Sequence, residues 1–282
     1  MDAQSLYESM MKRRSVRAFS HQEIPEPLID QLLSVANQAP SGGNIQPLSI
    51  IVVRSMDGRK RLSELVGGQP WVRNAPLSMV FCLDFYRVKK WAEMSQTDFV
   101  GNKALNHFLI AYADLMVAAQ NVVILAQGLG LGSVYVGSIQ NEIDAARQYF
   151  RIPAYVLPMM VLSLGYPKSV PKRVPKLNRE AITHWEKYRE PKDDEIRRAF
   201  DDKYGPVDDN IEKYLDKVFV EVLEADKQDA PQWLERVKQE MKRLDIQSTA
   251  AFLFRVRYPG EVMVKMNERL ARSFRNAGFE VV

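Results

Sequence analysis

Residues 105–138 read "LNHFLIAYADLMVAAQNVVILAQGLGLGSVYVGS", and this stretch decides the fold. Over about residues 104–127 the apolar side chains recur at the three- and four-residue spacing of an α-helix. Apolar residues also occupy most of the opposite face, so we expect this helix in the middle of the fold or in a subunit interface. Gln120, Asn121 and Gln127 interrupt the run, which predicts a buried helix and not a membrane span.

The glycines that follow, GLGLGS at 128–133, leave this helix and open a short strand at 132–138. A dinucleotide-binding glycine loop has the reverse order, because there the loop leaves a strand and the N-terminus of the next helix meets the pyrophosphate. We therefore interpret these glycines as a helix end and a turn.

The rest of the first 177 residues alternates between apolar runs and amphipathic segments. The short β-branched or apolar runs predict three more strands, at 49–54, 75–85 and 157–166. Helical spacing predicts helices before Pro40 and at about 57–66 and 141–150. This pattern predicts an α+β fold, with a central β-sheet flanked by helices in a core domain over 1–177. From 178 to 282 the chain is dense in charge with sparse apolar residues, which predicts a helical C-terminal extension.

Composition narrows the class of protein. The 282 residues are 46% hydrophobic and 26% charged, which is typical of a chain that buries a core. The net charge of +4 is too small to indicate a nucleic-acid partner unless the cations cluster on one surface. The first ten residues lack the basic and apolar regions of a signal peptide, so we expect a soluble cytoplasmic protein without a membrane partner.

Residue types also argue against several chemistries. The single cysteine, Cys82, lies in the apolar run SMVFCL and is expected to be a buried small side chain rather than a nucleophile. His21, His107 and His184 lack metal-ligand spacing, so no metal site is expected. No Ser–His–Asp arrangement or pair of catalytic carboxylates can be assigned. An enzyme with this sequence would therefore use a cofactor as its reactive group.

A basic stretch near the start, MKRRSVRAFS at 11–20, is the clearest candidate for binding such a cofactor. Arg14 and Arg17 are three residues apart, close enough to converge on one anion where the chain is helical or turning. Guanidinium groups suit phosphate, and the Ser15 hydroxyl could donate a further hydrogen bond. On spacing alone, an exposed basic helix end is the alternative.

Five stretches occur together in one order and spacing: RRSVRAF at 13–19, APSGGNIQPLSIIVV at 39–53, GGQPWVRNAPLSMVFCLDF at 67–85, AQGLGLGSVYVGSIQN at 126–141 and LPMMVLSLGYPKSVPKRVPKLNRE at 157–180. In that order they resemble the FMN-dependent nitroreductase family. GGQ and GLGSVYVGS look closest to the branch of oxygen-insensitive NADPH nitroreductases and NADPH-dependent flavin reductases.

The resemblance implies a mixed central sheet flanked by helices, in an intertwined homodimer that binds FMN at each subunit interface. In this branch the C-terminal segments wrap around the partner subunit, which implies that residues 178–282 pack on the second subunit. The implied reaction passes a hydride from NADPH or NADH to FMN. A small electron-poor aromatic acceptor, such as a nitroaromatic, a quinone or a free flavin, then takes two electrons by a ping-pong mechanism.

The resemblance also implies roles for individual residues. Arg13, Arg14, Ser15 and Arg17 would hold the FMN phosphate and the polar edge of the ring, and Gln69 would hydrogen-bond the flavin. Ser41 and Asn44 would approach from the other subunit. Tyr135, Val136, Gly137 and Ser138 would pass along the isoalloxazine, with a backbone N–H near Gly137 at the reactive N5. By residue type alone, Val136 is expected to be a core strand residue.

The family's late basic pair falls near residues 172–176, where Lys176 matches best and the second cation is displaced to Arg173 or Lys172. The 2′-phosphate of NADPH would need a further cation, with Lys203, Arg255 and Arg257 as candidates. Residues 86–102 are a candidate lid. Its Trp91 and Phe99 could stack on an aromatic acceptor or could anchor the loop.

Two other functions stay open at this point. One is different flavin chemistry on the same scaffold, such as reductive dehalogenation or flavin cleavage. The other is a basic, non-catalytic protein that binds an acidic partner or nucleic acid, which would depend strongly on salt.

Overall fold

The computed structural model describes residues 2–169, 171–172, 174–206, 211, 215 and 230–281. Its contacts divide the chain into two units, one of Met1–Pro171 with Met266–Val282 and the other of Lys172–Lys265. The first segment ends at Pro171, near the expected end at residue 177. The last residues of the chain, expected in the extension, belong with the sheet.

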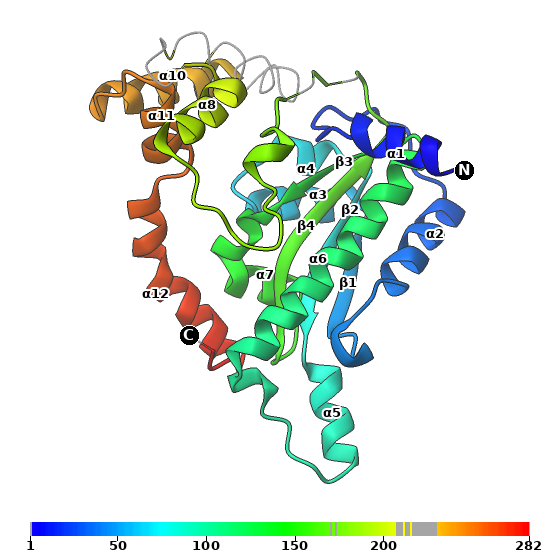
Figure 1. Cartoon of the computed structure of the whole chain (residues 1–282). Coiled ribbons are helices and arrows are strands. Elements are labelled where there is room, and N and C mark those ends of the chain that lie inside the picture. Colours follow the sequence, from blue (N-terminus) through cyan, green and yellow to red (C-terminus); the bar gives the residue numbers. More distant parts are fainter. Residues whose placement is uncertain are drawn as a thin grey trace. The chain divides into compact units, whose positions relative to one another are not determined.

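The first unit is built on a four-stranded sheet in the order β1-β2-β4-β3 (Figure 1). All neighbouring strands pair antiparallel, and the parallel pairing expected of a mixed sheet occurs at an isolated bridge between Ser15 and Ser133 beside β3. The four predicted strands are all present: β1 (Leu48–Val53), β2 (Leu77–Asp84), β3 (Gly132–Val136) and β4 (Val156–Gly165).

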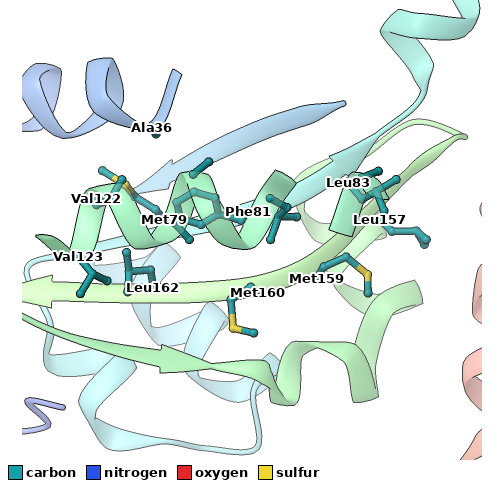
Figure 2. Packing of buried hydrophobic residues seen from close by; sticks show 14 of the residues in the cluster. Ala36, Met79, Phe81, Leu83, Val122, Val123, Leu157, Met159, Met160 and Leu162 are labelled. Carbon is teal, nitrogen blue, oxygen red and sulfur yellow. The ribbon is translucent and has the colours of Figure 1, made fainter. Parts of the chain in front are cut away.

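Strands β2 and β4 are buried along their whole length, because helices cover both faces of the sheet. Such strands need apolar side chains on both sides, which explains their nearly continuous apolar sequence. Met79 and Phe81 of β2 face the cluster under α2 (Glu26–Asn37) and α6 (Leu105–Gly128), shown in Figure 2. Val80 and Cys82 alternate to the other face. That face is covered by α3 (Met56–Leu65) and α4 (Pro70–Asn74).

Helix α6 confirms both the predicted helix and its predicted end. Gly130 has a φ of 76°, and it donates its N–H to the carbonyl of Gln127 over 3.1 Å. Leu131 donates to the carbonyl of Ala126 over 2.8 Å. These two bonds form the glycine-terminated helix end that satisfies the last carbonyls, so the glycines do not form a phosphate loop. One side of α6 packs on the sheet, and the other exposes four large apolar side chains: Leu105, Leu109, Ile110 and Val117.

The C-terminal residues return to the first unit through aromatic packing. Phe279 is fully buried, with its ring centroid 5.5 Å from that of Phe85. The Asn102 side chain donates to the carbonyl of Gly278 over 2.8 Å, and the Asn102 carbonyl accepts from the Glu280 N–H over 2.9 Å. Burial of large aromatic side chains thus fixes this segment, although the sequence before it is highly charged.

The remaining helices of the first unit are α1 (Ala3–Lys12), α5 (Tyr86–Met94) and α7 (Ile143–Phe150). The second unit contains α8 (Asp193–Tyr204), α10 (Ala230–Arg243) and α11 (Thr249–Phe252). Its small core includes Ile211, Leu215, Ile246 and Phe252. Helix α12 (Gly260–Asn276) begins in the second unit and ends in the first.

Candidate active site

The basic segment lies against the edge of β3. Ser15 forms the isolated bridge with Ser133, and the Val16 N–H donates to the Ser133 carbonyl over 2.9 Å. The basic segment can approach β3 this closely because residue 132 is a glycine: an added Cβ there would lie 2.5 Å from Cγ2 of Val16. Val16 itself is buried, so it anchors the segment while the neighbouring arginines stay partly exposed.

The three arginines of this segment have different surroundings. The Arg14 guanidinium donates to the carbonyls of Arg13 over 2.8 Å and Met11 over 3.2 Å, and so stabilises the end of α1. The Arg17 guanidinium lies over the Trp71 ring, 5.5 Å from its centroid, a cation–π geometry. Arg14 and Arg17 are therefore held by different partners. Arg13 is close enough to Tyr135 to oppose the rise in that tyrosine's pKa.

Gln69 and Ser138 are brought together from positions 69 residues apart. The Gln69 amide donates to the Ser138 hydroxyl over 2.9 Å, and both side chains donate to the Val66 carbonyl. The loop before Gln69 can turn this sharply because Gly67 and Gly68 both have positive φ. These bonds join the loop to the 3₁₀ turn η3 (Gly137–Glu142) that follows β3.

The segment from Tyr135 to Gly137 presents one half-buried side chain and open backbone. The Tyr135 hydroxyl donates to Gln120 of α6 over 3.3 Å, and burial raises the pKa of Tyr135 to about 12, so the phenol stays protonated at neutral pH. Val136 is 3% exposed and belongs to the core, as its residue type predicts. A Cβ added to Gly137 would meet only the Met160 methyl within 4 Å, at 3.7 Å. Figure 2 shows the Met160 side chain pointing toward η3.

Ser41 and Asn44 lie in a separate place, in and beside the turn η1 (Gly42–Asn44). The Ser41 hydroxyl donates to Asp114 of α6 over 2.7 Å. Asp114 is six residues before Gln120 on the same helix, a rise of about 9 Å. Within one chain, the structure therefore does not bring Ser41 and Asn44 into the group around Tyr135.

The late basic residues belong to another unit or lie outside the described residues. Lys176 belongs to the second unit, as do Lys203, Arg255 and Arg257. Arg173 lies outside the residues that the structure describes. Arg255 donates to the Leu244 carbonyl over 2.9 Å, and the Lys203 ammonium lies 4.7 Å from the Tyr204 ring centroid.

In the candidate lid, the two aromatic residues differ. Phe99 packs edge-on against Phe85 with ring centroids 5.4 Å apart, which supports the anchoring role. Trp91 is 50% exposed, and the Arg87 guanidinium lies 5.8 Å from its ring centroid.

The sequence analysis did not single out Trp71 or Asp114. Trp71 has a buried indole N–H with no hydrogen-bond partner among the described residues. The sequence does distinguish Asp114, because no other Asp, Glu, Lys or Arg occurs in residues 105–128. A lone charge in an apolar helix needs a polar partner, although its identity depends on the fold.

The described residues hold no group of three or more His, Cys, Asp or Glu that could bind a metal ion. Burial raises the pKa of the Cys82 thiol to about 12, so this cysteine stays protonated and is no nucleophile at neutral pH. The remaining polar groups are cations, an amide, hydroxyls and the backbone of Gly137. Fold and site together define an α+β protein whose cations and hydrogen-bonding groups suit an anionic ligand.

Comparison with known proteins identifies the family. The model of the nitroreductase family matches residues 10–166. The chain is 33% identical to an FMN reductase (NADPH) of Bacillus subtilis over 66% of this chain and 76% of that protein. It is 30% identical to an oxygen-insensitive NADPH nitroreductase of Salmonella typhimurium over 70% of this chain and 79% of the relative. The chain belongs to the nitroreductase family.

A solved structure extends the likeness beyond the matched domain. A nitroreductase from Bacillus subtilis superposes with a TM-score of 0.73 at 25% identity, covering 98% of this chain and 99% of the other. The similarity in fold therefore includes the C-terminal region that the family model does not reach.

Proposed function

We propose that this protein is an FMN-dependent oxidoreductase that takes reducing equivalents from NADPH or NADH and passes them to nitroaromatics, quinones or free flavins. The observation that carries the proposal is the basic segment fixed against β3 beside Gly137 and the Gln69–Ser138 pair. Relatives named as NADPH-dependent FMN reductase and nitroreductase support the same activity.

The residues present fit FMN in their chemistry. The backbone at Gly137 is open on its Cβ side, since a Cβ there would meet a single atom within 4 Å. The Trp71 N–H is a buried donor that has no partner in the part of the chain that the structure describes, and the Trp71 ring lies beside the cation of Arg17. Arginines with amide and hydroxyl donors are the groups that bind phosphate and the carbonyl edge of a flavin.

When bound, FMN supplies the two-electron chemistry that lets a reduced nicotinamide reduce an acceptor. The chain binds and orients it. Arg13 and Arg17 favour negative charge at the site, because a cation lowers the energy of a nearby anion most where water is partly excluded. The Gln69–Ser138 bond fixes the loop at residues 66–69 against η3, and this loop would hold Gln69 in place beside the bound cofactor.

We assign FMN binding to side chains of one copy and, from a second copy, to the turn near η1. The first set comprises Arg13, Arg14, Ser15, Arg17, Gln69, Tyr135 and Ser138, with backbone from Val136 and Gly137. The second set comprises Ser41 and Asn44. Lys176 and Arg173 are proposed as further phosphate-binding cations on the sequence resemblance alone.

A homodimer is part of this proposal, and α6 provides the surface that supports it. Leu105, Leu109 and Val117 follow one side of the helix at spacings of four and eight residues, and all are exposed. Among the described residues α6 is also the helix long and apolar enough to cross a membrane. Its opposite side packs on the sheet, so a second copy explains the exposed stripe better than lipid does. The resemblance further supports packing of the charged C-terminal region on that copy, in a soluble cytoplasmic protein, apart from Phe274 and Phe279, which pack in the core of their own chain.

The double variant Leu109→Arg/Val117→Arg is expected to be monomeric, because two cations on the stripe would face their own copies across the interface. Light scattering after size exclusion would give twice the chain mass of 32.3 kDa for the wild type and the single mass for the variant. Met94→Arg, at a 79% exposed position on α5, is the matched control and should stay dimeric. A wild-type protein of single mass would contradict the homodimer.

The absorption spectrum of the purified protein, before and after anaerobic NADPH, tests the cofactor and donor together. We expect two visible flavin bands that bleach on NADPH, and FMN released on heating. Bands that NADPH leaves unchanged would contradict the donor. Absence of flavin, with none taken up from added FMN, would contradict the proposed function. Turnover of a nitroaromatic or quinone then separates this activity from other flavin chemistry on the same scaffold.

A further inference from the structure

Asp114 bonds to the segment that leads out of α2. Its carboxylate accepts hydrogen bonds from the Ser41 hydroxyl over 2.7 Å and from the Gly42 N–H over 3.0 Å. The contact is tight, because an added Cβ at Gly42 would lie 2.5 Å from Cγ2 of Ile110 on the same helix. Asp114 therefore holds residues 41 and 42 directly against α6.

The turn that Asp114 holds has a costly backbone conformation. Gly43, Asn44 and Gln46 have φ values of 59°, 54° and 51°. For a residue other than glycine, this left-handed region is disfavoured, because the Cβ atom lies close to the backbone. Such a conformation persists only where the surroundings fix it.

The other end of the turn is held by Arg87 of α5. Its Nη2 donates to the carbonyls of Gln46 over 2.8 Å and Leu48 over 2.9 Å. Within the turn, the Ser41 hydroxyl oxygen accepts from the Gln46 N–H over 2.9 Å. Ser41 thus joins the two ends, and its orientation is set by Asp114.

A cavity of about 340 Å³ adjoins the turn, lined in part by Asn37, Pro40, Ser41, Trp91 and Asp114. The bonds of Asp114 and Arg87 go to the turn, so these groups support the turn rather than face a ligand. The cavity also gives the turn space into which it could relax if a support were removed.

We propose that Asp114 is the positioning residue of the turn at 41–46 and that it sets FMN affinity through Ser41 and Gly42. This inference rests on the proposed function, in which Ser41 and Asn44 reach the FMN held by the second copy. Asp114 itself does not touch FMN. It keeps the turn in the one conformation that presents those two side chains.

The test compares Asp114→Leu with Asp114→Asn by FMN titration of the apoprotein, using flavin fluorescence, and by the visible circular dichroism of bound FMN. Asp114→Leu removes both acceptor bonds and should raise the dissociation constant about tenfold or more. In Asp114→Asn the amide oxygen can still accept from Ser41 and Gly42, so we expect a value within about threefold of wild type. A merely structural role would not produce rescue by the asparagine.

Asn121→Leu is the matched control, because it removes a hydrogen bond between α6 and the Val35 carbonyl without touching the turn. Its FMN affinity should equal that of wild type. If Asp114→Leu binds FMN as wild type does, or if Asp114→Asn is as weak as Asp114→Leu, the proposal is wrong. Should Asp114→Leu not fold, Asp114→Ala takes its place, because it also removes both acceptor bonds and leaves Ser41 intact: about tenfold weaker binding supports the proposal and unchanged binding overturns it. A wild-type chain that takes up no FMN would overturn the proposed function, and this inference with it.

Discussion

The variant Arg17→Ala is expected to bind FMN roughly 10- to 100-fold more weakly than the wild type, the loss expected for a charge-assisted phosphate contact. Arg17 lies in the segment fixed against β3, with its guanidinium over the Trp71 ring. Truncation removes the cation and leaves the anchoring contacts of Val16 in place. FMN titration of the apoprotein measures the effect.

Three further variants show which property of Arg17 and its surroundings causes the weaker FMN binding. Arg17→Lys keeps the charge but loses the planar fork, so its affinity should fall between wild type and Arg17→Ala. Trp71→Phe keeps an aromatic face for Arg17 and removes the buried indole N–H, which isolates that donor's contribution. Arg54→Ala removes an equal charge from an exposed ion pair with Glu26 and should bind FMN normally. Equal affinities for Arg17→Ala and wild type would remove Arg17 from the site.

Truncation of Phe279 is expected to have the largest effect on stability. Phe279→Ala should cost about 3–5 kcal/mol, the usual loss for a fully buried phenylalanine. Its ring packs on those of Phe85 and Phe108, with centroids 5.5 and 6.3 Å away. In a chain of this size the loss corresponds to a fall in the melting temperature of roughly 6–20 °C.

Thermal unfolding of the apoprotein, followed by circular dichroism at one protein concentration, measures this loss. Phe254→Ala removes the same side chain from a 67% exposed position and should change the melting temperature little. If the two variants have the same melting temperature, packing of the C-terminal segment does not stabilise the sheet domain.

Features that depend on a few neighbouring residues were predictable from the amino-acid sequence. Apolar runs identified β2 and β4, because strands covered on both faces need apolar side chains throughout. The glycines after α6 marked its end, because Gly130 adopts the positive φ that the helix end requires. Cys82 was predicted to be buried from its apolar neighbours, and it is. Motif order also gave the family, which the match over residues 10–166 confirms.

Contacts between residues far apart in the chain could be identified only from the folded structure. Asn102 bonds to a carbonyl 176 residues later, and Asp114 bonds to a hydroxyl 73 residues earlier. The return of Phe279 likewise places the last residues of the chain in the same unit as the sheet. Local periodicity reports only which face of an element is apolar. Partners so far apart in the chain are selected by the packing of whole elements, where burial and complete hydrogen bonding must be satisfied together.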